Sequence, residues 1–172
     1  MVNVGRALVE AQVGDREVRR ARQVVEIDPS DGVSLLLAGL ATIHAGQWPE
    51  ARTILERAAG LLEGKTMWGV LARGFLACTA GQHEGARSAA REPLCEPLGR
   101  VDEQFSWMLS GLLATAGDHD GALHWLENAV RRGFTNHRFL AERDMLLAPL
   151  RDDPRFKQLM DEARRLSSSS EG

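Results

Sequence analysis

Apolar side chains recur at intervals of three and four residues along most of the chain. Clear examples are Ile54, Leu55 and Ala58 in one segment and Leu109, Leu112 and Leu113 in another. This spacing places them on one face of an α-helix, and no run of valine, isoleucine or threonine shows the two-residue alternation of a strand. The pattern therefore predicts an all-α fold made of short helices.

Glycine-containing turns divide this pattern into a series of expected helices. Their approximate bounds are 2–12, 15–27, 32–45, 48–62, 66–80, 83–92, 102–116, 119–132, 137–148 and 153–166. Pro93 and Pro97 should make 91–100 an irregular loop, because proline ends a helix and restricts the residue before it. Pro154 suits the first turn of the last helix, and the polar tail 167–172 is expected to be disordered.

One turn sequence occurs three times in the same register. It reads AGQWPEARTILERAA from Ala45, AGQHEGARSAAREPL from Ala80 and AGDHDGALHWLENAV from Ala116. Each turn glycine is followed five residues later by alanine and preceded seven residues earlier by a small residue. The spacings between the three glycines are 35 and 36 residues, and Gly14 marks a looser fourth copy. A fixed period of this length is typical of repeat proteins.

The period and the small residues resemble the tetratricopeptide repeat, a helix–turn–helix unit of about 34 residues. The resemblance implies a right-handed α-solenoid of about four repeats at 1–31, 32–65, 66–101 and 102–135. It also implies that small residues such as Gly39 and Gly74 face the alanines of the second helices. Residues 136–166 would then be capping helices that hide the last apolar face, as in the tails of many bacterial repeat proteins.

In this family the first helix of each repeat lines a concave groove that receives a peptide. The corresponding groove positions here are Leu36, Leu40, Ile43, His44, Trp68, Leu71, Phe75, Cys78, Trp107 and Met108. We expect about half of these side chains to be exposed. An apolar groove suits an amphipathic helix or an extended hydrophobic segment of another protein. Alternatively, the C-terminal helices or a second copy of the chain, in a homo-oligomer, fill the groove.

Composition narrows the class of protein. The chain has 172 residues, 44% hydrophobic and 26% charged, with a net charge of −3, as expected for a soluble folded protein without general nucleic-acid affinity. The N-terminal residues lack the apolar run of a signal peptide, and no stretch approaches the roughly 20 apolar residues that span a bilayer. We therefore expect a cytoplasmic protein that acts at neither a membrane nor a nucleic acid.

Two carboxylates and two imidazoles that could take part in catalysis or metal binding lie within seven residues of one another: Asp118, His119, Asp120 and His124. The repeat register makes Asp118 a helix cap, and Asp120 would meet His124 four residues later on the helix surface. The two histidines are five residues apart, too far round the helix to chelate one ion readily. We expect no cofactor, no metal and no enzymatic activity; a metal-binding or enzymatic protein using His119 and His124 is the weaker alternative.

Overall fold

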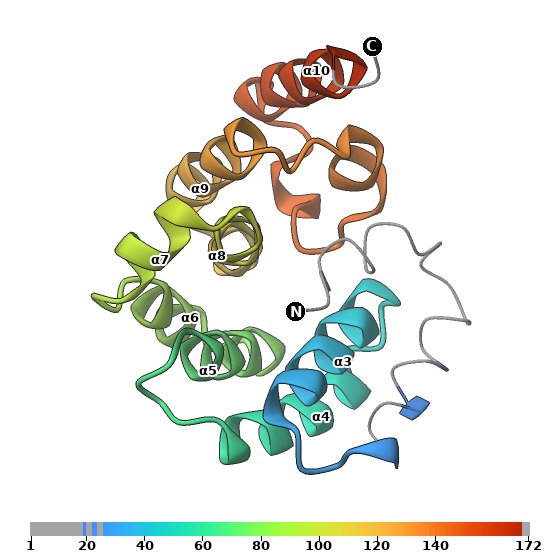
Figure 1. The fold of residues 1–172 in the computed structure, drawn as a ribbon, viewed down its shortest axis with the longest axis vertical. Helices are drawn as coiled ribbons and strands as arrows, with labels where there is room; N and C mark the ends of the chain where they lie inside the picture. The colour runs from blue at the N-terminus through green and yellow to red at the C-terminus, as the bar shows by residue number, and fades with distance from the viewer. Residues whose placement is uncertain (1–18, 20–21, 24–25, 170–172) are drawn as a thin grey trace.

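The computed structural model describes residues 19, 22–23 and 26–169, and this part of the chain is helical without strands (Figure 1). The predicted all-α class is confirmed. Most of the first predicted repeat, including its first helix 2–12, lies outside the described residues; of the expected second helix 15–27, residues 19, 22–23 and 26–27 are described and helical. The elements are α3 (Gly32–His44), α4 (Trp48–Leu61), α5 (Met67–Thr79), α6 (His83–Ala90), α7 (Cys95–Val101), α8 (Glu103–Thr115), α9 (His119–Arg131), η1 (Phe139–Arg143), η2 (Ala148–Leu150) and α10 (Pro154–Ser169). None of the described helices is long and apolar enough to cross a bilayer.

Four helices begin at a side-chain cap. The caps of α3, α5, α8 and α9 are Asp31, Thr66, Asp102 and Asp118. Each side-chain oxygen accepts a hydrogen bond from a backbone amide two or three residues later, which satisfies a donor that the first helical turn leaves free. The predicted cap Asp118 is confirmed, with its Oδ1 3.0 Å from the amide nitrogen of Gly121.

The three repeated glycines end the first helix of each pair in the same way. Gly46, Gly81 and Gly117 have φ values of 76°, 68° and 79°. In each turn the amide after the glycine donates to the carbonyl five residues earlier, at 3.1, 2.8 and 2.9 Å. This is the Schellman arrangement, whose left-handed residue favours glycine because a β-carbon would be strained there. The predicted turns are confirmed.

Each of these turns joins two helices that pack together: α3 with α4, α5 with α6, and α8 with α9. Contacts also link successive pairs, through α4 with α5 and through α5 and α6 with α8. The pairs follow one another along an arc that α10 continues, and the chain between α9 and α10 returns inside it (Figure 1).

Small residues allow the helices to approach closely, but the side chains that face these glycines differ from the alanines that were expected. A β-carbon at Gly39 would lie 2.7 Å from the Leu55 side chain. One at Gly74 would lie 2.7 Å from Leu112 of the next pair and 3.3 Å from Ala89. Gly74 therefore brings two helix pairs together as well as the two helices of its own pair.

Residues 91–100, expected as an irregular loop, contain helix α7. The prediction holds for residues 91–94, which follow the short helix α6, and was wrong from Cys95 onward, because Pro97 lies in the first turn of α7, where a missing backbone N–H costs no helical hydrogen bond. Gly99 then lets α7 approach its neighbours, since a β-carbon there would lie 2.7 Å from the Trp125 ring and 2.8 Å from Leu109.

The helix expected at 137–148 is not continuous. The chain makes a π-helical turn (η1), passes through an extended Asp144 with φ −68° and ψ 105°, and makes a 3₁₀ turn (η2). The Asp144 carboxylate accepts the amides of Leu146 and Leu147 at 2.9 and 3.3 Å. An aspartate that bonds the amides following it offers the backbone an alternative to the helix.

Helix α10 packs against α9, and Pro154 is its first residue, as predicted. Its buried side chains are Phe156, Leu159, Met160 and Ala163. The helix extends through Ser169, so residues 167–169, expected to be disordered, are helical. The remaining tail residues lie outside the described part of the chain.

Candidate functional site

The chain between α9 and α10 lies against the first helices of the repeated pairs. We call residues 134–150 the inner segment, and the surface of α3 and α8 that it contacts the inner face. Two contacts define this placement: the Met145 amide lies 3.4 Å from Nδ1 of His44 on α3, and the Asp144 carboxylate bonds Trp107 on α8. The groove of the sequence analysis is therefore occupied by the chain itself.

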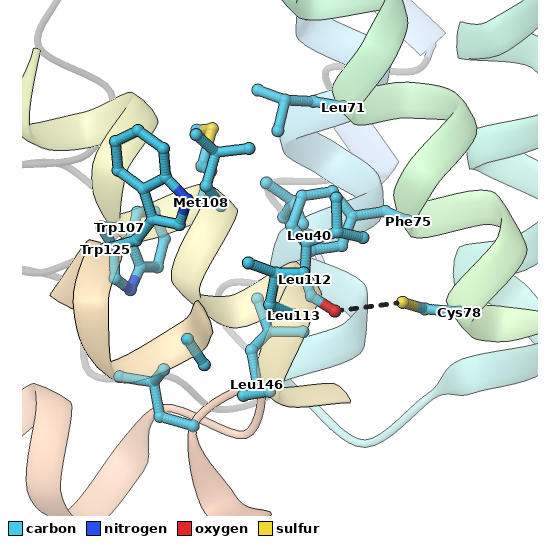
Figure 2. Close-up of a cluster of buried hydrophobic side chains, with 14 of the residues drawn as sticks. Leu40, Leu71, Phe75, Cys78, Trp107, Met108, Leu112, Leu113, Trp125 and Leu146 are labelled. Atoms are coloured by element: carbon cyan, nitrogen blue, oxygen red, sulfur yellow. Dashed lines mark hydrogen bonds between the residues drawn. The ribbon is translucent and has the colours of Figure 1, made fainter. Parts of the chain in front are cut away.

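The predicted groove residues are core residues in this structure. Those at most 7% exposed are Leu36, Leu40, Ile43, His44, Leu71, Phe75, Cys78, Trp107 and Met108. Trp68 alone is half-buried, with its ring 5.0 Å from that of Phe105. Several of them belong to one buried cluster with Leu112 and Leu146 (Figure 2).

The expectation that about half of these positions would be exposed is wrong. The helices that carry them, α3, α5 and α8, pack against one another, which buries one side of each. The inner segment contacts His44 at the end of α3 and covers Trp107 and Gly111 of α8.

Trp107 is the centre of the site. Its side chain is fully buried and stacks on Phe134 with centroids 5.3 Å apart and on His44 at 6.1 Å. Phe139 meets it edge-on at 6.0 Å. Two of these three ring partners, Phe134 and Phe139, belong to the inner segment, so Trp107 joins the repeated pairs to the inner segment.

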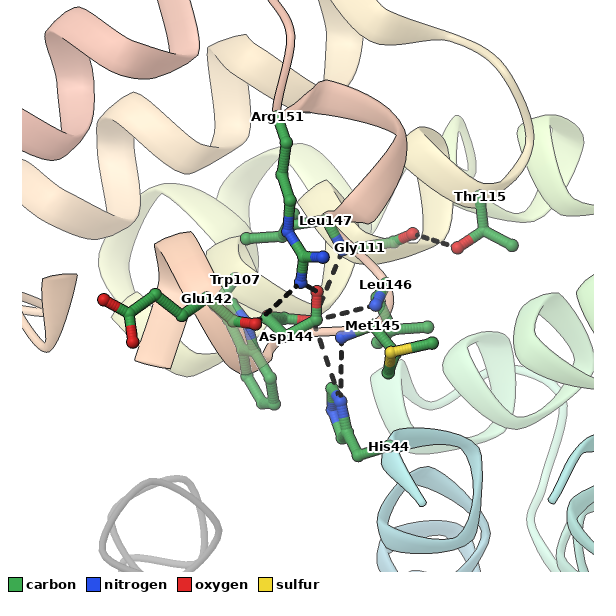
Figure 3. A network of polar contacts seen from close by, with 10 residues as sticks. All are labelled: His44, Trp107, Gly111, Thr115, Glu142, Asp144, Met145, Leu146, Leu147 and Arg151. Carbon is green, nitrogen blue, oxygen red and sulfur yellow. Dashed lines mark hydrogen bonds and ion pairs between the residues drawn. The ribbon is translucent and has the colours of Figure 1, made fainter. Parts of the chain in front are cut away.

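Asp144 is the polar anchor of the inner segment (Figure 3). It is completely buried, and its Oδ2 accepts the indole N–H of Trp107 at 2.6 Å. Its other oxygen accepts the amides of Leu146 and Leu147. The Arg151 guanidinium donates to the carbonyl of Asp144 at 3.1 Å and holds the backbone from the other side. Such charge-assisted bonds are the strong ones in a buried setting.

His44 lies beside this anchor, with Nδ1 3.7 Å from the Asp144 carboxylate (Figure 3). Burial lowers the pKa of His44, and the Asp144 charge opposes this only in part. The imidazole is therefore neutral at neutral pH. Because Nδ1 accepts the Met145 amide, the proton sits on Nε2, which is buried and has no hydrogen-bond partner among the described residues.

Leu146 inserts into the one place on α8 that lacks a side chain. A β-carbon at Gly111 would lie 2.9 Å from Cβ of Leu146, so only glycine leaves room for it. Leu146 is fully buried, whereas its neighbour Met145 is 38% exposed. Over residues 144–146 the inner segment thus presents alternate side chains to the inside and to the outside, and the next side chain, Leu147, is again buried.

The remaining sequence candidates lie elsewhere. Asp120 pairs with Arg155 of α10 at 2.7 Å instead of with His124, whose ring packs against Trp125. Burial raises the pKa of Cys78 to about 12, so its thiol stays protonated at neutral pH. Within the described residues, no group of three or more histidine, cysteine, aspartate or glutamate side chains could hold a metal ion.

A surface pocket of about 320 Å³ lies between the start of α7 and α9. Leu113 and Trp125 supply its apolar lining, and Arg91 and Asp118 form an ion pair of 3.1 Å at it. The sequence analysis did not single out this pocket, because it depends on the position of α7.

Sequence reasoning also missed Asp144, Leu146 and Arg151. One signal was available: Gly133 repeats the turn glycine, with φ 115°, and Phe134 donates to the Ala129 carbonyl at 3.0 Å as in the repeated turns. A glycine followed by an apolar residue marks a helix end whose next residue packs back onto the helix. No local sequence pattern predicted the path that the chain takes after that turn.

No family model matches the chain, and neither a curated protein nor a solved structure gives a significant match. The resemblance to tetratricopeptide repeats therefore rests on the repeated turn glycines and small residues of the sequence alone.

Proposed function

We propose that this chain is a protein-interaction module of tetratricopeptide-like helix pairs, a scaffold or adaptor that binds an apolar or amphipathic segment of another protein. The observation that carries the proposal is the inner face. It already holds an irregular stretch of chain through an aromatic cluster, a pocket for one leucine and bonds to backbone amides. Alternating side-chain pockets combined with main-chain bonds are how extended peptides are recognised.

The proposal places the protein in the cytoplasm. Its two cysteines, Cys78 and Cys95, are buried and unpaired. Unpaired thiols are kept reduced in the cytosol, whereas secreted domains of this size commonly carry disulfides.

Site-specific photo-crosslinking in cells that express the chain tests the proposal. A benzophenone amino acid at Thr115, half-buried on α8 four residues after Gly111, should give an adduct with one partner protein, because this position belongs to a helix of the inner face itself. The matched control is Glu56 on α4, whose side chain is 53% exposed. Adducts at both positions, or at neither, would contradict the proposal.

The alternative is a homo-oligomer in which a second copy of the chain contacts the inner face. It predicts an adduct at Thr115 with twice the mass of the chain. Light scattering over a wide range of protein concentrations gives the independent check, because a chain that stays monomeric excludes this alternative.

A further inference from the structure

We infer that the inner segment is an intramolecular ligand, which a partner peptide of the same chemistry displaces from the inner face. That chemistry is an aromatic residue, an aspartate five residues later and a leucine two residues after the aspartate, as in Phe139, Asp144 and Leu146. The inference rests on the proposed function and adds the kind of peptide that the inner face selects.

Three contacts select these side chains. Phe139 meets the rings of His44 and Trp107 edge-on, with centroids 5.7 and 6.0 Å apart. The Asp144 carboxylate takes the buried indole N–H at 2.6 Å. The leucine fills the space above Gly111. Each contact is made by a side chain of the inner segment with a residue at least 32 positions away, so the inner face could make the same contacts with a separate peptide.

The inner segment can leave the inner face without unfolding the helices at its two ends. Helix α9 precedes it and α10 follows it, and these two helices pack against each other directly. The ion pair between Asp120 of α9 and Arg155 of α10 adds a link that does not involve the inner segment. Residues 134–150 therefore form a loop whose ends stay held together when it opens.

The docked state leaves a polar atom unsatisfied. The His44 side chain is 1% exposed, and its Nε2 has no hydrogen-bond partner among the described residues. A buried donor without an acceptor weakens the state that buries it. A partner peptide with a carbonyl or amide oxygen in reach of Nε2 would gain a bond that the inner segment lacks, which would favour exchange.

Native-state hydrogen exchange on the unmodified chain tests whether the loop opens. The amides of Leu146 and Leu147, which the Asp144 carboxylate accepts, should exchange at least about tenfold faster than core amides of α8 under conditions where opening is in rapid equilibrium. If these amides exchange only as fast as α8, the inner segment opens with the whole fold and the inference is overturned.

A labelled peptide of residues 137–151 tests recognition by fluorescence anisotropy. Leu146→Ala weakens docking of the chain's own segment, and Met145→Ala is the matched control on the exposed neighbour. The Leu146→Ala chain should bind the peptide at least about tenfold more tightly than the wild-type and Met145→Ala chains. A peptide with alanine at positions 144 and 146 should not bind.

Equal binding by the two variants, or equal binding of the two peptides, overturns the inference. So does loss of helical circular dichroism in the Leu146→Ala chain, because the inner segment would then be an integral part of the core. If peptide exchange occurs but crosslinking at Thr115 finds no partner, the proposed function fails alone. If a partner is found while the segment stays closed, the inference fails alone.

Discussion

The second helices of the repeated pairs and the inner segment all begin after the same kind of glycine turn, but their backbones are then stabilised in different ways. After Gly117 the chain enters α9 at the Asp118 cap, and its backbone is satisfied by bonds within the helix. After Gly133 the chain makes only short turns, and its central residue Asp144 bonds Trp107, 37 residues away. Local hydrogen bonds hold the pairs, whereas side chains from distant elements hold the inner segment.

Their buried polar groups differ as well. In the pairs, Ser106 donates to the Gly99 carbonyl at 2.9 Å, and Asn128 donates to both at 3.1 and 2.6 Å. The buried side-chain atoms without a partner among the described residues are Gln47 Oε1 at the start of α4 and, beside the inner segment, His44 Nε2 and Arg151 Nε. A fully connected polar network rigidifies a core, whereas a partly satisfied one weakens it. Two of these three atoms lie beside the inner segment, so its polar contacts are less completely satisfied than those of the pairs.

Trp107→Ala should have the largest effect, because this residue joins the two regions. It removes a fully buried ring and leaves the Asp144 carboxylate without its indole donor. We expect a loss of about 3–5 kcal/mol in the free energy of unfolding, measured by urea denaturation. Trp107→Phe keeps a ring but not the donor, so a loss as large as that of the alanine variant would contradict a role for ring packing.

Comparing Asp144→Ala with Asp118→Ala sets a buried anchor against a half-buried cap. Asp144→Ala leaves the Trp107 indole and two backbone amides without their acceptor, so we expect a loss of about 2–4 kcal/mol. Asp118→Ala removes a cap at the start of α9 and should cost only about 1 kcal/mol. Urea denaturation of both variants measures the difference, and equal losses would mean that the inner segment is held by apolar contacts alone.

A lower pH should weaken the inner segment through His44. Burial lowers its pKa in the folded chain below the ordinary value of 6.5, so the unfolded chain binds the proton more readily. This destabilisation is absent at neutral pH and appears as the pH falls below about 6.5, at no more than about 1.4 kcal/mol per pH unit. Urea midpoints between about pH 7.5 and pH 5.5 should fall less in His44→Phe than in the wild type; parallel curves would refute the assignment.

The smallest effect concerns the turns of the repeated pairs. Gly81→Ala places a β-carbon at φ 68° with open space around it, so only backbone strain opposes it, at about 1 kcal/mol. Gly60→Ala, inside α4 and also in open space, should instead stabilise the chain by about 0.5–1 kcal/mol. Thermal unfolding of the two variants should therefore shift in opposite directions.

The sequence analysis found the regular part of the fold and missed the irregular part. Helix bounds from α3 to α6 and from α8 to α9 came within two residues, since apolar periodicity, caps and turn glycines act over a few neighbouring positions. Helix α7 was missed because Pro97 was taken as a breaker rather than as a first-turn residue. The expected helix at 137–148 failed because a buried Asp144 competes with helical bonds, and its burial depends on Trp107.

The sequence analysis predicted which groove residues belong to the candidate site, but it did not predict that they are buried. The residues chosen for the groove do lie on the first helices of the pairs and do gather in one cluster, yet nearly all are buried. The spacing of apolar residues at three and four positions predicts which side of a helix is apolar, but it does not predict what covers that side.

The amino-acid sequence by itself determined the all-α class, the helix pairs and their turns, because their hydrogen bonds close within about six residues. Only the tertiary structure decided what fills the inner face. The contact between His44 and Met145 joins residues 101 positions apart, and the pocket for Leu146 exists only because α8 presents Gly111 there. Such contacts depend on where whole helices lie, which no local pattern encodes.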